Sequence, residues 1–476
     1  MSELKTKTVK GMLWGAAERF SVQGVQFVVM LVMARLLTPR DYGLVGMIAI
    51  FTAVSQVLVE SGFTQALIRK KDRSRVDDST VFYFNTVLSL VLYGVLYLGA
   101  PLVARFYDMP ELTQVMRVIS IVVVVNAFGL VQRAVMSVNL DFKSQAKASF
   151  TAAIISGIAG ITLALTGHGV WALVWQQILN AAIATAMLWV LAKWRPVRAF
   201  SWSSFKELFA FGSKLMVSAL LDQTWNNIYG LVIGKFFRAD TLGYYTRASS
   251  FAQLPTSSFA QILSKVSYPS LCKLQEDEAK LAESYRKFLR MAAFAIFPLT
   301  MLLAGIASPM TVVLIGEKWL YAGTLLTIIC FSLMWMPIHA VNLNLLVVKG
   351  RSDLFLRLEL YKKGVAALLI VATIPLGIEA VCWGQVASSI IAFAINTRYT
   401  GQFINMGFFR QLHDITPSLG LSLLVFAASY SATYIFANAW ASLAVSAVAG
   451  LAVAAIAMAA HRFTEFDELK AIIRNR

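Results

Sequence analysis

Charged residues are scarce in this chain. Of its 476 residues only 14% are charged, whereas 58% are hydrophobic, and the mean hydropathy is +0.67. Soluble domains carry about 25% charged residues, so this composition excludes that class and indicates a membrane protein. The formal charge of +17 is spread between apolar runs, without a basic patch interleaved with aromatic residues. It therefore indicates loops at an anionic lipid surface, and not a nucleic-acid partner.

Cysteine is rarer still, and nucleotide-binding motifs are missing. Cys272, Cys330 and Cys382 have no paired spacing, which excludes a disulfide framework and predicts no metal site. No GxxxxGK[ST] stretch occurs, so no Walker-type ATP site is predicted. The opening MSELKTKTVK runs into the first apolar stretch without a small-residue cleavage site, which predicts a retained membrane anchor.

Long apolar runs dominate the rest of the chain. A bilayer-spanning helix needs about twenty mostly apolar residues. The eleventh run fits this requirement least well, because Glu359, Lys362 and Lys363 leave only GVAALLIVATIPLG cleanly apolar. The sequence predicts an all-α integral membrane protein with fourteen transmembrane helices. They lie at 11–35, 42–67, 80–106, 112–136, 145–166, 169–192, 208–234, 246–270, 288–315, 320–348, 355–376, 379–402, 416–437 and 439–461.

The basic residues predict the orientation of these helices. With the N-terminus inside, the internal connections hold 29 of the 42 Lys and Arg residues and the external ones hold eight. Cytoplasmic loops carry such an excess, so both termini are expected in the cytoplasm. Several external connections are very short, namely GHG, GIEA and NAW. They leave no room for a loop of catalytic carboxylates, which argues against an integral-membrane glycan polymerase or ligase.

One pattern recurs two hundred residues apart. The chain reads LVMARLLTPRDYG at 31–43 and LVIGKFFRADTLG at 231–243, each time between the first and second helix of a set of six. Six is an even number, so both sets enter the membrane in the same direction, as in the parallel repeats of several transporters. We expect one lobe over 1–200, a second over 201–410, and two further helices with a cytoplasmic tail over 411–476.

The first and second helices of both sets carry polar stripes. Residues four apart share a helix face, so these stripes predict either a hydrated central cavity or hydrogen bonds between helices. The stripes comprise Arg19, Gln23 and Gln26; Thr52, Gln56, Glu60 and Thr64; Lys214, Ser218, Asp222 and Asn226; and Gln253, Ser257, Gln261 and Lys265.

Charges within these helices are the candidate site. An ionised side chain at the bilayer centre costs about 2.5–3.5 kcal/mol on insertion scales, which marks it as functional by default. Arg19, Lys214 and Lys265 would face a cavity, and arginine suits phosphate oxygens in particular. The predicted substrate-binding residues are Arg19, Lys214, Lys265, Asp222 and Asn226.

The carboxylates leave two alternatives open. Glu60 and Asp222 either pair with these cations or couple transport to an ion, and Glu18 is a third candidate for coupling. Arg133 and Arg398 lie near the cytoplasmic ends of their helices, where a long side chain reaches water.

Three stretches resemble the Wzx-type flippases of the multidrug/oligosaccharidyl-lipid/polysaccharide (MOP) superfamily, notably the colanic-acid and lipopolysaccharide exporters. They are ARLLTPRDYG (34–43), GVWALVWQQI (169–178) and FGSKLMVSALLDQTWNNIYGLVIGKFFRADTLGYYTRASSFAQLP (211–255). The resemblance implies a flippase of the bacterial inner membrane that moves undecaprenyl-pyrophosphate-linked oligosaccharides between leaflets by alternating access.

By position, the resemblance implies that Arg19 and Lys214 contact the pyrophosphate. It also implies no cofactor, with transport coupled to H⁺, Na⁺ or the membrane potential, and a polysaccharide polymerase and chain-length proteins as partners. A multidrug or small-cation antiporter of the same superfamily and a non-transporting membrane scaffold remain alternatives. The antiporter would favour acidic residues in its cavity, and the scaffold would tolerate neutralisation of Arg19.

Overall fold

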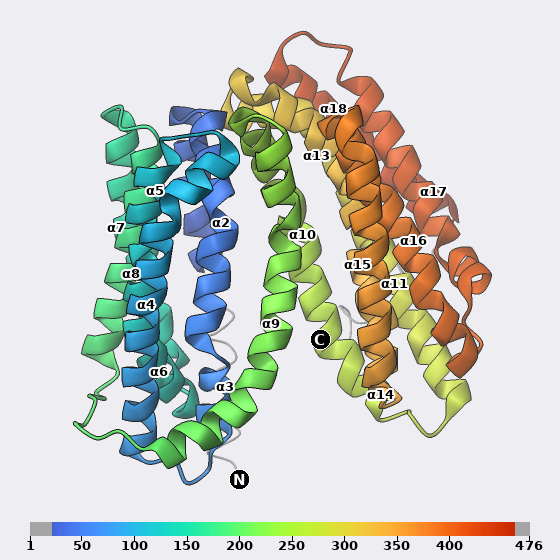
Figure 1. Ribbon diagram of the computed structural model, residues 1–476. Coiled ribbons are helices and arrows are strands. Elements are labelled where there is room, and N and C mark those ends of the chain that lie inside the picture. Colours follow the sequence, from blue (N-terminus) through green and yellow to red (C-terminus); the bar gives the residue numbers. More distant parts are fainter. Residues whose placement is uncertain (1–20, 462–476) are drawn as a thin grey trace. The chain divides into compact units, whose positions relative to one another are not determined.

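The computed structural model describes residues 21–461, and every regular element in that range is a helix. The chain forms two compact units, residues 1–243 and 244–476. In the first unit a helix over Ser21–Leu36 precedes α2 (Pro39–Glu60), α3 (Phe63–Arg69), α4 (Arg75–Tyr107), α5 (Leu112–Ile119), α6 (Ile121–Val138), α7 (Phe142–Leu165), α8 (Val170–Leu191) and α9 (Trp202–Phe236) (Figure 1).

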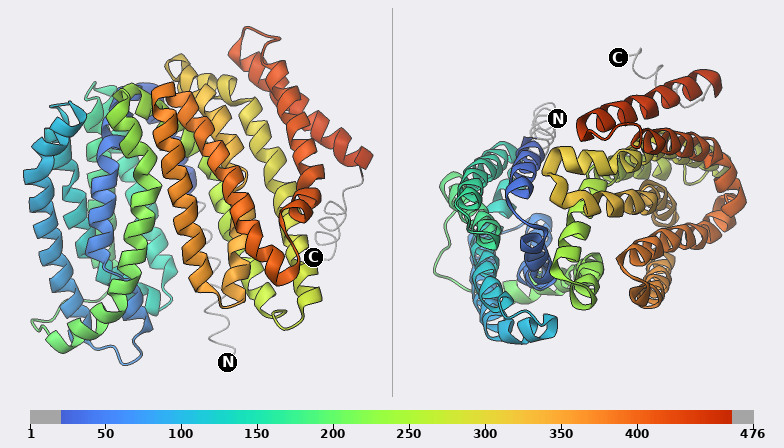
Figure 2. Two further views of the ribbon diagram at one scale, coloured as in Figure 1. Left: turned by 45° about the vertical axis from the view of Figure 1, so that its right-hand side comes forward. Right: turned by 90° about the horizontal axis from the view of Figure 1, so that it is seen from above.

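The second unit begins within α10, whose first residues belong to the first unit. Helices α17 and α18 lie side by side at its edge (Figure 2). The elements are α10 (Ala239–Cys272), α11 (Glu278–Gly305), α12 (Ala307–Ile315), η1 (Glu317–Trp319), α13 (Leu320–Leu333), α14 (Met336–Val348), α15 (Ser352–Thr373), η2 (Ile374–Leu376), α16 (Ile378–Ile404), α17 (Phe408–Ala432) and α18 (Ala439–His461).

Ten helical stretches of the described chain are long and apolar enough to cross a membrane. They coincide with the second to sixth, ninth, tenth and twelfth to fourteenth predicted segments, which confirms a multi-pass, all-helical membrane protein. The first predicted segment lies partly outside the described residues. The seventh, eighth and eleventh form α9, α10 and α15, which are long but more polar.

Part of the polarity of α15 is neutralised within the helix itself. Lys362 Nζ lies 2.5 Å from Glu359 Oε1, one helical turn away, and both side chains are largely shielded. Paired charges are far less costly in a low-dielectric environment than isolated ones. The polar side chains of α9 and α10 are described with the candidate site.

The two recurring segments lie against each other in the first unit. The first one starts α2 with a capping box, in which Thr38 and Asp41 each accept a hydrogen bond from the other's backbone N–H. A Cβ atom at Gly43 would overlap the carbonyl oxygen of Ala239, and a Cβ at Gly243 would overlap that of Pro39. The start of α2 therefore crosses the start of α10 reciprocally, and the recurring glycines permit this close approach.

A second glycine crossing joins α2 to α9. Gly62 has a φ of +67°, and a Cβ there would overlap the carbonyl oxygen of Gly212, whereas a Cβ at Gly212 would overlap that of Ser61. Helix α9 packs along α2 and also contacts α3 and α4 (Figure 1). Helix α9, the first helix of the predicted second lobe, thus packs within the first unit. The lobe boundaries at residues 200 and 410 remain a prediction.

Charge pairs join the connection after α3 to α9. Lys70 Nζ lies 2.8 Å from Glu207 Oε2 and 3.1 Å from Asp77 Oδ1. The hydrogen bond with Glu207 raises the pKa of Lys70 above its ordinary value, so this lysine stays charged. The pairs fix the beginning of α9 next to the beginning of α4.

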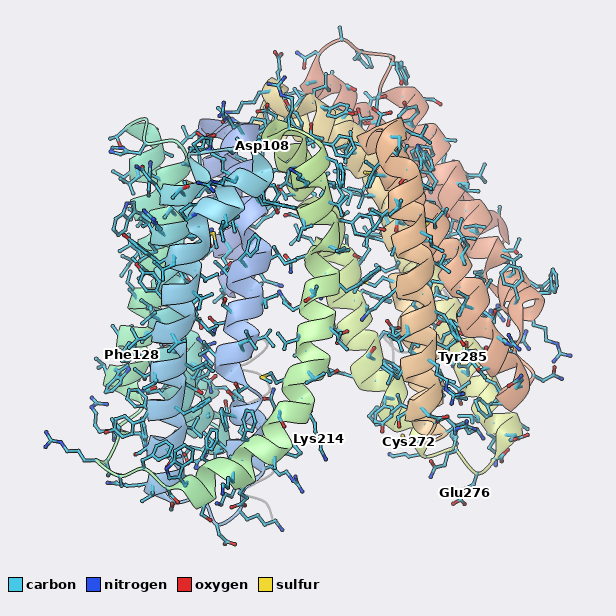
Figure 3. All side chains as sticks on the ribbon, in the orientation of Figure 1. Asp108, Phe128, Lys214, Cys272, Glu276 and Tyr285 are labelled. Carbon is cyan, nitrogen blue, oxygen red and sulfur yellow. The ribbon has the colours of Figure 1, made fainter. Side chains whose placement is uncertain are left out.

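A buried polar network fixes α17 in the second unit. The Tyr285 hydroxyl donates to Asn342 Oδ1 over 2.8 Å, and Gln411 Nε2 donates to Asn342 Oδ1 and to the Thr400 hydroxyl. These residues belong to α11, α14, α17 and α16, and Tyr285 lies low on α11 (Figure 3). Each buried polar group finds a partner here, and so the network holds the four helices in one arrangement.

We predict that Gly212→Ala destabilises the protein, because the added methyl group would overlap the backbone of Ser61 at the crossing. Overpacking of this kind costs about 1–3 kcal/mol. The matched control is Gly230→Ala on the same helix, where no described atom lies within 4 Å of the added Cβ. There alanine should be neutral or stabilise the helix by up to about 1 kcal/mol. Thermal unfolding of the purified protein, followed by tryptophan fluorescence, checks both, and equal stabilities would contradict a tight crossing.

Candidate functional site

A polar stripe runs along the facing sides of α2 and α6. Asn126 Nδ2 donates a hydrogen bond to Gln56 Oε1 over 3.3 Å. Asn126 and Arg133 are seven residues apart on α6, and Gln56 and Glu60 are four apart on α2, so each pair shares a helix face. Because Asn126 contacts Gln56, the side chains of Arg133 and Glu60 lie on the facing sides of α6 and α2 as well.

Glu60 and Arg133 lie within electrostatic range of each other at the end of this stripe, without a direct ion pair between their side chains. Arg133 is close enough to act on the Glu60 carboxylate, and both residues have exposed side chains although they lie in apolar, span-length helices. An exposed charge on such a helix requires water or a charged partner, because lipid offers neither. At this end of the stripe the two charges therefore need water or each other as partners.

The polar face of α9 begins next to that pair. Lys214 lies two residues from Gly212, and Glu60 two residues from Gly62, so the glycine crossing brings lysine and glutamate into the same neighbourhood. Lys214 is exposed, lies on the lower half of α9 (Figure 3), and makes no ion pair with the described residues. Lys214 lies twelve residues after Trp202, the first residue of α9, and the rise of an α-helix places it about 18 Å from that end.

Asp222 and Asn226 continue this face. They follow Lys214 by eight and twelve residues, which keeps all three on one side of the helix. Asp222 and Asn226 are exposed, and Asp222 has an interaction partner of its own. The face thus alternates a cation, a carboxylate and an amide over more than three helical turns.

The second unit carries its own polar face on α10. Gln253, Gln261 and Lys265 are exposed, and they are separated by multiples of four residues. Ser257, between them, donates its hydroxyl to the carbonyl oxygen of Gln253 over 2.7 Å. Lys265, like Lys214, makes no ion pair with any residue that the structure describes.

The predicted site residues thus fall into three groups. Arg19 and Glu18 lie outside the described residues. Glu60, Lys214, Asp222 and Asn226 lie on α2 and α9 within the first unit, and Lys265 lies on α10 in the second. The sequence interpretation missed Asn126 and treated Arg133 only as a residue that reaches water at a helix end. Their seven-residue spacing on α6 was the available signal.

Ammonium and guanidinium groups next to amides are suited to bind an anion such as a phosphate ester. No group of three or more His, Cys, Asp or Glu residues in the described chain could hold a metal ion.

Comparison with known proteins shows the family to which this chain belongs. Residues 32–324, more than half of the chain, match the family described as polysaccharide biosynthesis protein. The chain is 25% identical over 460 residues to the teichuronic acid biosynthesis protein TuaB of Bacillus subtilis (strain 168), covering 94% of this chain and 95% of TuaB. It is also 25% identical to the lipopolysaccharide biosynthesis protein WzxC of Escherichia coli (strain K12), covering 81% and 77% of the two chains.

Solved structures show the same fold. The lipid II flippase MurJ in an inward closed conformation superimposes with a TM-score of 0.76 at 15% identity, covering 94% of this chain and 98% of MurJ. A multidrug resistance MATE family transporter of the MOP superfamily, in an inward-facing conformation, gives a TM-score of 0.58 at 16% identity, covering 83% and 95%. This chain is therefore a multi-pass membrane protein with a MurJ-like and MATE-like fold, and it belongs to the polysaccharide biosynthesis protein family.

Proposed function

We propose that this protein is a flippase, which moves undecaprenyl-pyrophosphate-linked oligosaccharide units from the inner to the outer leaflet of the bacterial cytoplasmic membrane for surface polysaccharide biosynthesis. The observation that carries this proposal is the presence of cations on the polar faces of membrane-length helices, above all Lys214 on α9. Family membership and relatives named for teichuronic acid and lipopolysaccharide biosynthesis support it. The fold shared with a lipid II flippase supports it further.

The pyrophosphate is the part of this substrate that needs protein inside the membrane. Its charges cannot cross hydrocarbon unaided, whereas the prenyl chain can remain in lipid. In our proposal Lys214, Lys265 and Arg19 bind the pyrophosphate. Asp222 accepts hydrogen bonds from the hydroxyl groups of the first sugars, and the Asn226 amide donates hydrogen bonds to them and accepts hydrogen bonds from them. No cofactor is required, and Glu60, Asp222 or Glu18 would couple transport to H⁺ or Na⁺.

The proposed topology follows the sequence. It has fourteen transmembrane helices in two six-helix lobes, with both termini in the cytoplasm. In this orientation the reciprocal crossing of Gly43 and Gly243 lies at the outer face. The polysaccharide polymerase and the chain-length proteins would receive the translocated units.

A second candidate function is export of small cations or drugs. The MATE-like fold favours it, since that comparison is with a multidrug resistance transporter, and Glu60 and Asp222 are exposed acidic residues on the polar faces. Lys214, Lys265 and Arg133 would repel a cationic drug from the same faces. The balance of charge therefore favours an anionic head group.

We predict that Lys214→Gln reduces translocation of the lipid-linked oligosaccharide at least about tenfold, because a charged hydrogen bond to phosphate contributes about 1.5–3 kcal/mol. The measurement is a leaflet-resolved assay of the precursor in cells that lack this protein and are complemented with each variant. The matched control is Lys206→Gln, on the same helix but before the Gly212 crossing, and it should translocate as the wild type does.

Two results would count against this assignment. Normal translocation in the deletion strain, without a paralogue, would remove the flippase function. Full activity of a well-expressed Lys214→Gln would leave that function in place but remove Lys214 from the site.

Exchanging the charges of Glu60 and Arg133 tests whether Glu60 couples transport to an ion or only interacts with Arg133. We predict that Glu60→Arg and Arg133→Glu each destabilise the protein by about 1–3 kcal/mol, since each leaves like charges side by side. The double variant should regain thermal stability but not translocation, because the carboxylate would have left α2. Thermal unfolding and the leaflet-resolved assay measure the two effects separately. Recovery of both in the double variant would make the pair structural and exclude Glu60 as the coupling residue.

A further inference from the structure

The second unit contains a cavity that the proposed transport site does not use. It has a volume of about 540 Å³ and lies between the first turns of α11, the end of α16 and the first turns of α17. Its charged and polar lining consists of Glu283, Arg286, Arg410, His413 and Asp414. Its apolar lining consists of Ala279, Ala282, Ile404, Met406 and Phe409.

One charge pair in this cavity is already satisfied. The Arg286 guanidinium donates from Nε to Asp414 Oδ2 over 2.8 Å and from Nη2 to Asp414 Oδ1 over 2.5 Å. Asp414 is buried beneath the arginine. This bidentate salt bridge joins α11 to α17, and its two charges neutralise each other.

The remaining charges have opposite signs. Arg410 uses one Nη atom to donate to the carbonyl oxygen of Asn405 over 2.9 Å, which leaves its other donors available. Its neighbour His413 is exposed, and Glu283 is exposed as well. Neither of the latter two makes a hydrogen bond or ion pair with a described residue. The cavity therefore offers separate cationic and anionic groups, and so it suits a dipolar ligand better than a simple anion.

The position of the cavity brings it to the membrane surface. The candidate spans Glu278–Gly305, Ile378–Ile404 and Phe408–Ala432 all begin or end at its walls. Phe409 is 82% exposed at the start of the last of these. A large apolar side chain that is exposed at the end of a span borders the lipid, and the largely buried Ile404 and Met406 line the cavity.

From these observations we infer that the cavity binds the head group of a zwitterionic phospholipid with a primary ammonium, such as phosphatidylethanolamine. Arg410 and His413 would hold the phosphate, and Glu283 would accept hydrogen bonds from the ammonium. The exposed Phe409 side chain would contact the glycerol and the first methylene groups. This site is separate from the polar faces of α9 and α10 and does not depend on the transported substrate.

The test is a titration of the purified full-length protein in detergent with short-chain (dihexanoyl) phospholipids. We expect phosphatidylethanolamine to bind about tenfold tighter than phosphatidylglycerol, which lacks the ammonium. Phosphatidylcholine should also bind more weakly, since its quaternary ammonium donates no hydrogen bond. Phosphatidylglycerol binding as tightly or more tightly would overturn the proposal in favour of an anionic lipid. Inorganic phosphate competing equally well would reduce the cavity to an anion site.

Two substitutions give a signature that a structural role would not produce. Glu283→Gln should abolish the preference for phosphatidylethanolamine while retaining binding of phosphatidylglycerol. Arg410→Gln should weaken both lipids about tenfold. Glu276→Gln, in the loop between α10 and α11 (Figure 3), and Arg357→Gln on α15 are the matched controls, because neither residue lines the cavity. An unchanged lipid preference in Glu283→Gln would contradict the assignment, whatever the result of the translocation assays.

Discussion

A bilayer offers no hydrogen-bond partner and no counterion to a polar side chain, and the arrangement of this protein depends on that constraint. Ten helical stretches satisfy this constraint because their residues are mostly apolar. Helices α9 and α10 do not, and they expose Lys214, Asp222 and Lys265 along membrane-length segments. Such helices are stable only where water, protein or a polar substrate faces them. The same property that makes them costly in lipid makes them suitable for carrying a charged head group across.

Close helix contact is what holds these polar helices in place. At two crossings the backbone atoms of facing helices approach so closely that only glycine fits, at Gly43 with Gly243 and at Gly62 with Gly212. The first crossing gives a physical meaning to the recurring sequence pattern, because each copy supplies the space that the other requires. The second brings the part of α9 that carries Lys214 next to the end of α2 that carries Glu60.

Much of the fold could be predicted from the sequence, since hydrophobic length is a local property. Ten predicted spans coincide with apolar helices, and two of the four predicted polar stripes fall on α9 and α10. The packing of α9 within the first unit could not be predicted, because it depends on backbone contact at Gly212 and not on composition. The proximity of Glu60 to Arg133 and the cavity around Glu283 and Arg410 involve residues far apart in sequence. Only the three-dimensional arrangement brings these residues together.

The central claim is that this chain alone moves a lipid-linked oligosaccharide across a bilayer. The most direct test is a leaflet-resolved translocation assay with the purified protein in liposomes that carry undecaprenyl-pyrophosphate-linked oligosaccharide on one side. An ion gradient or membrane potential is applied across the liposomes. The account predicts that the substrate becomes accessible on the opposite face in protein-containing liposomes and not in empty ones. If folded, correctly inserted protein left the substrate on its original face but transported cationic drugs, the account would be contradicted.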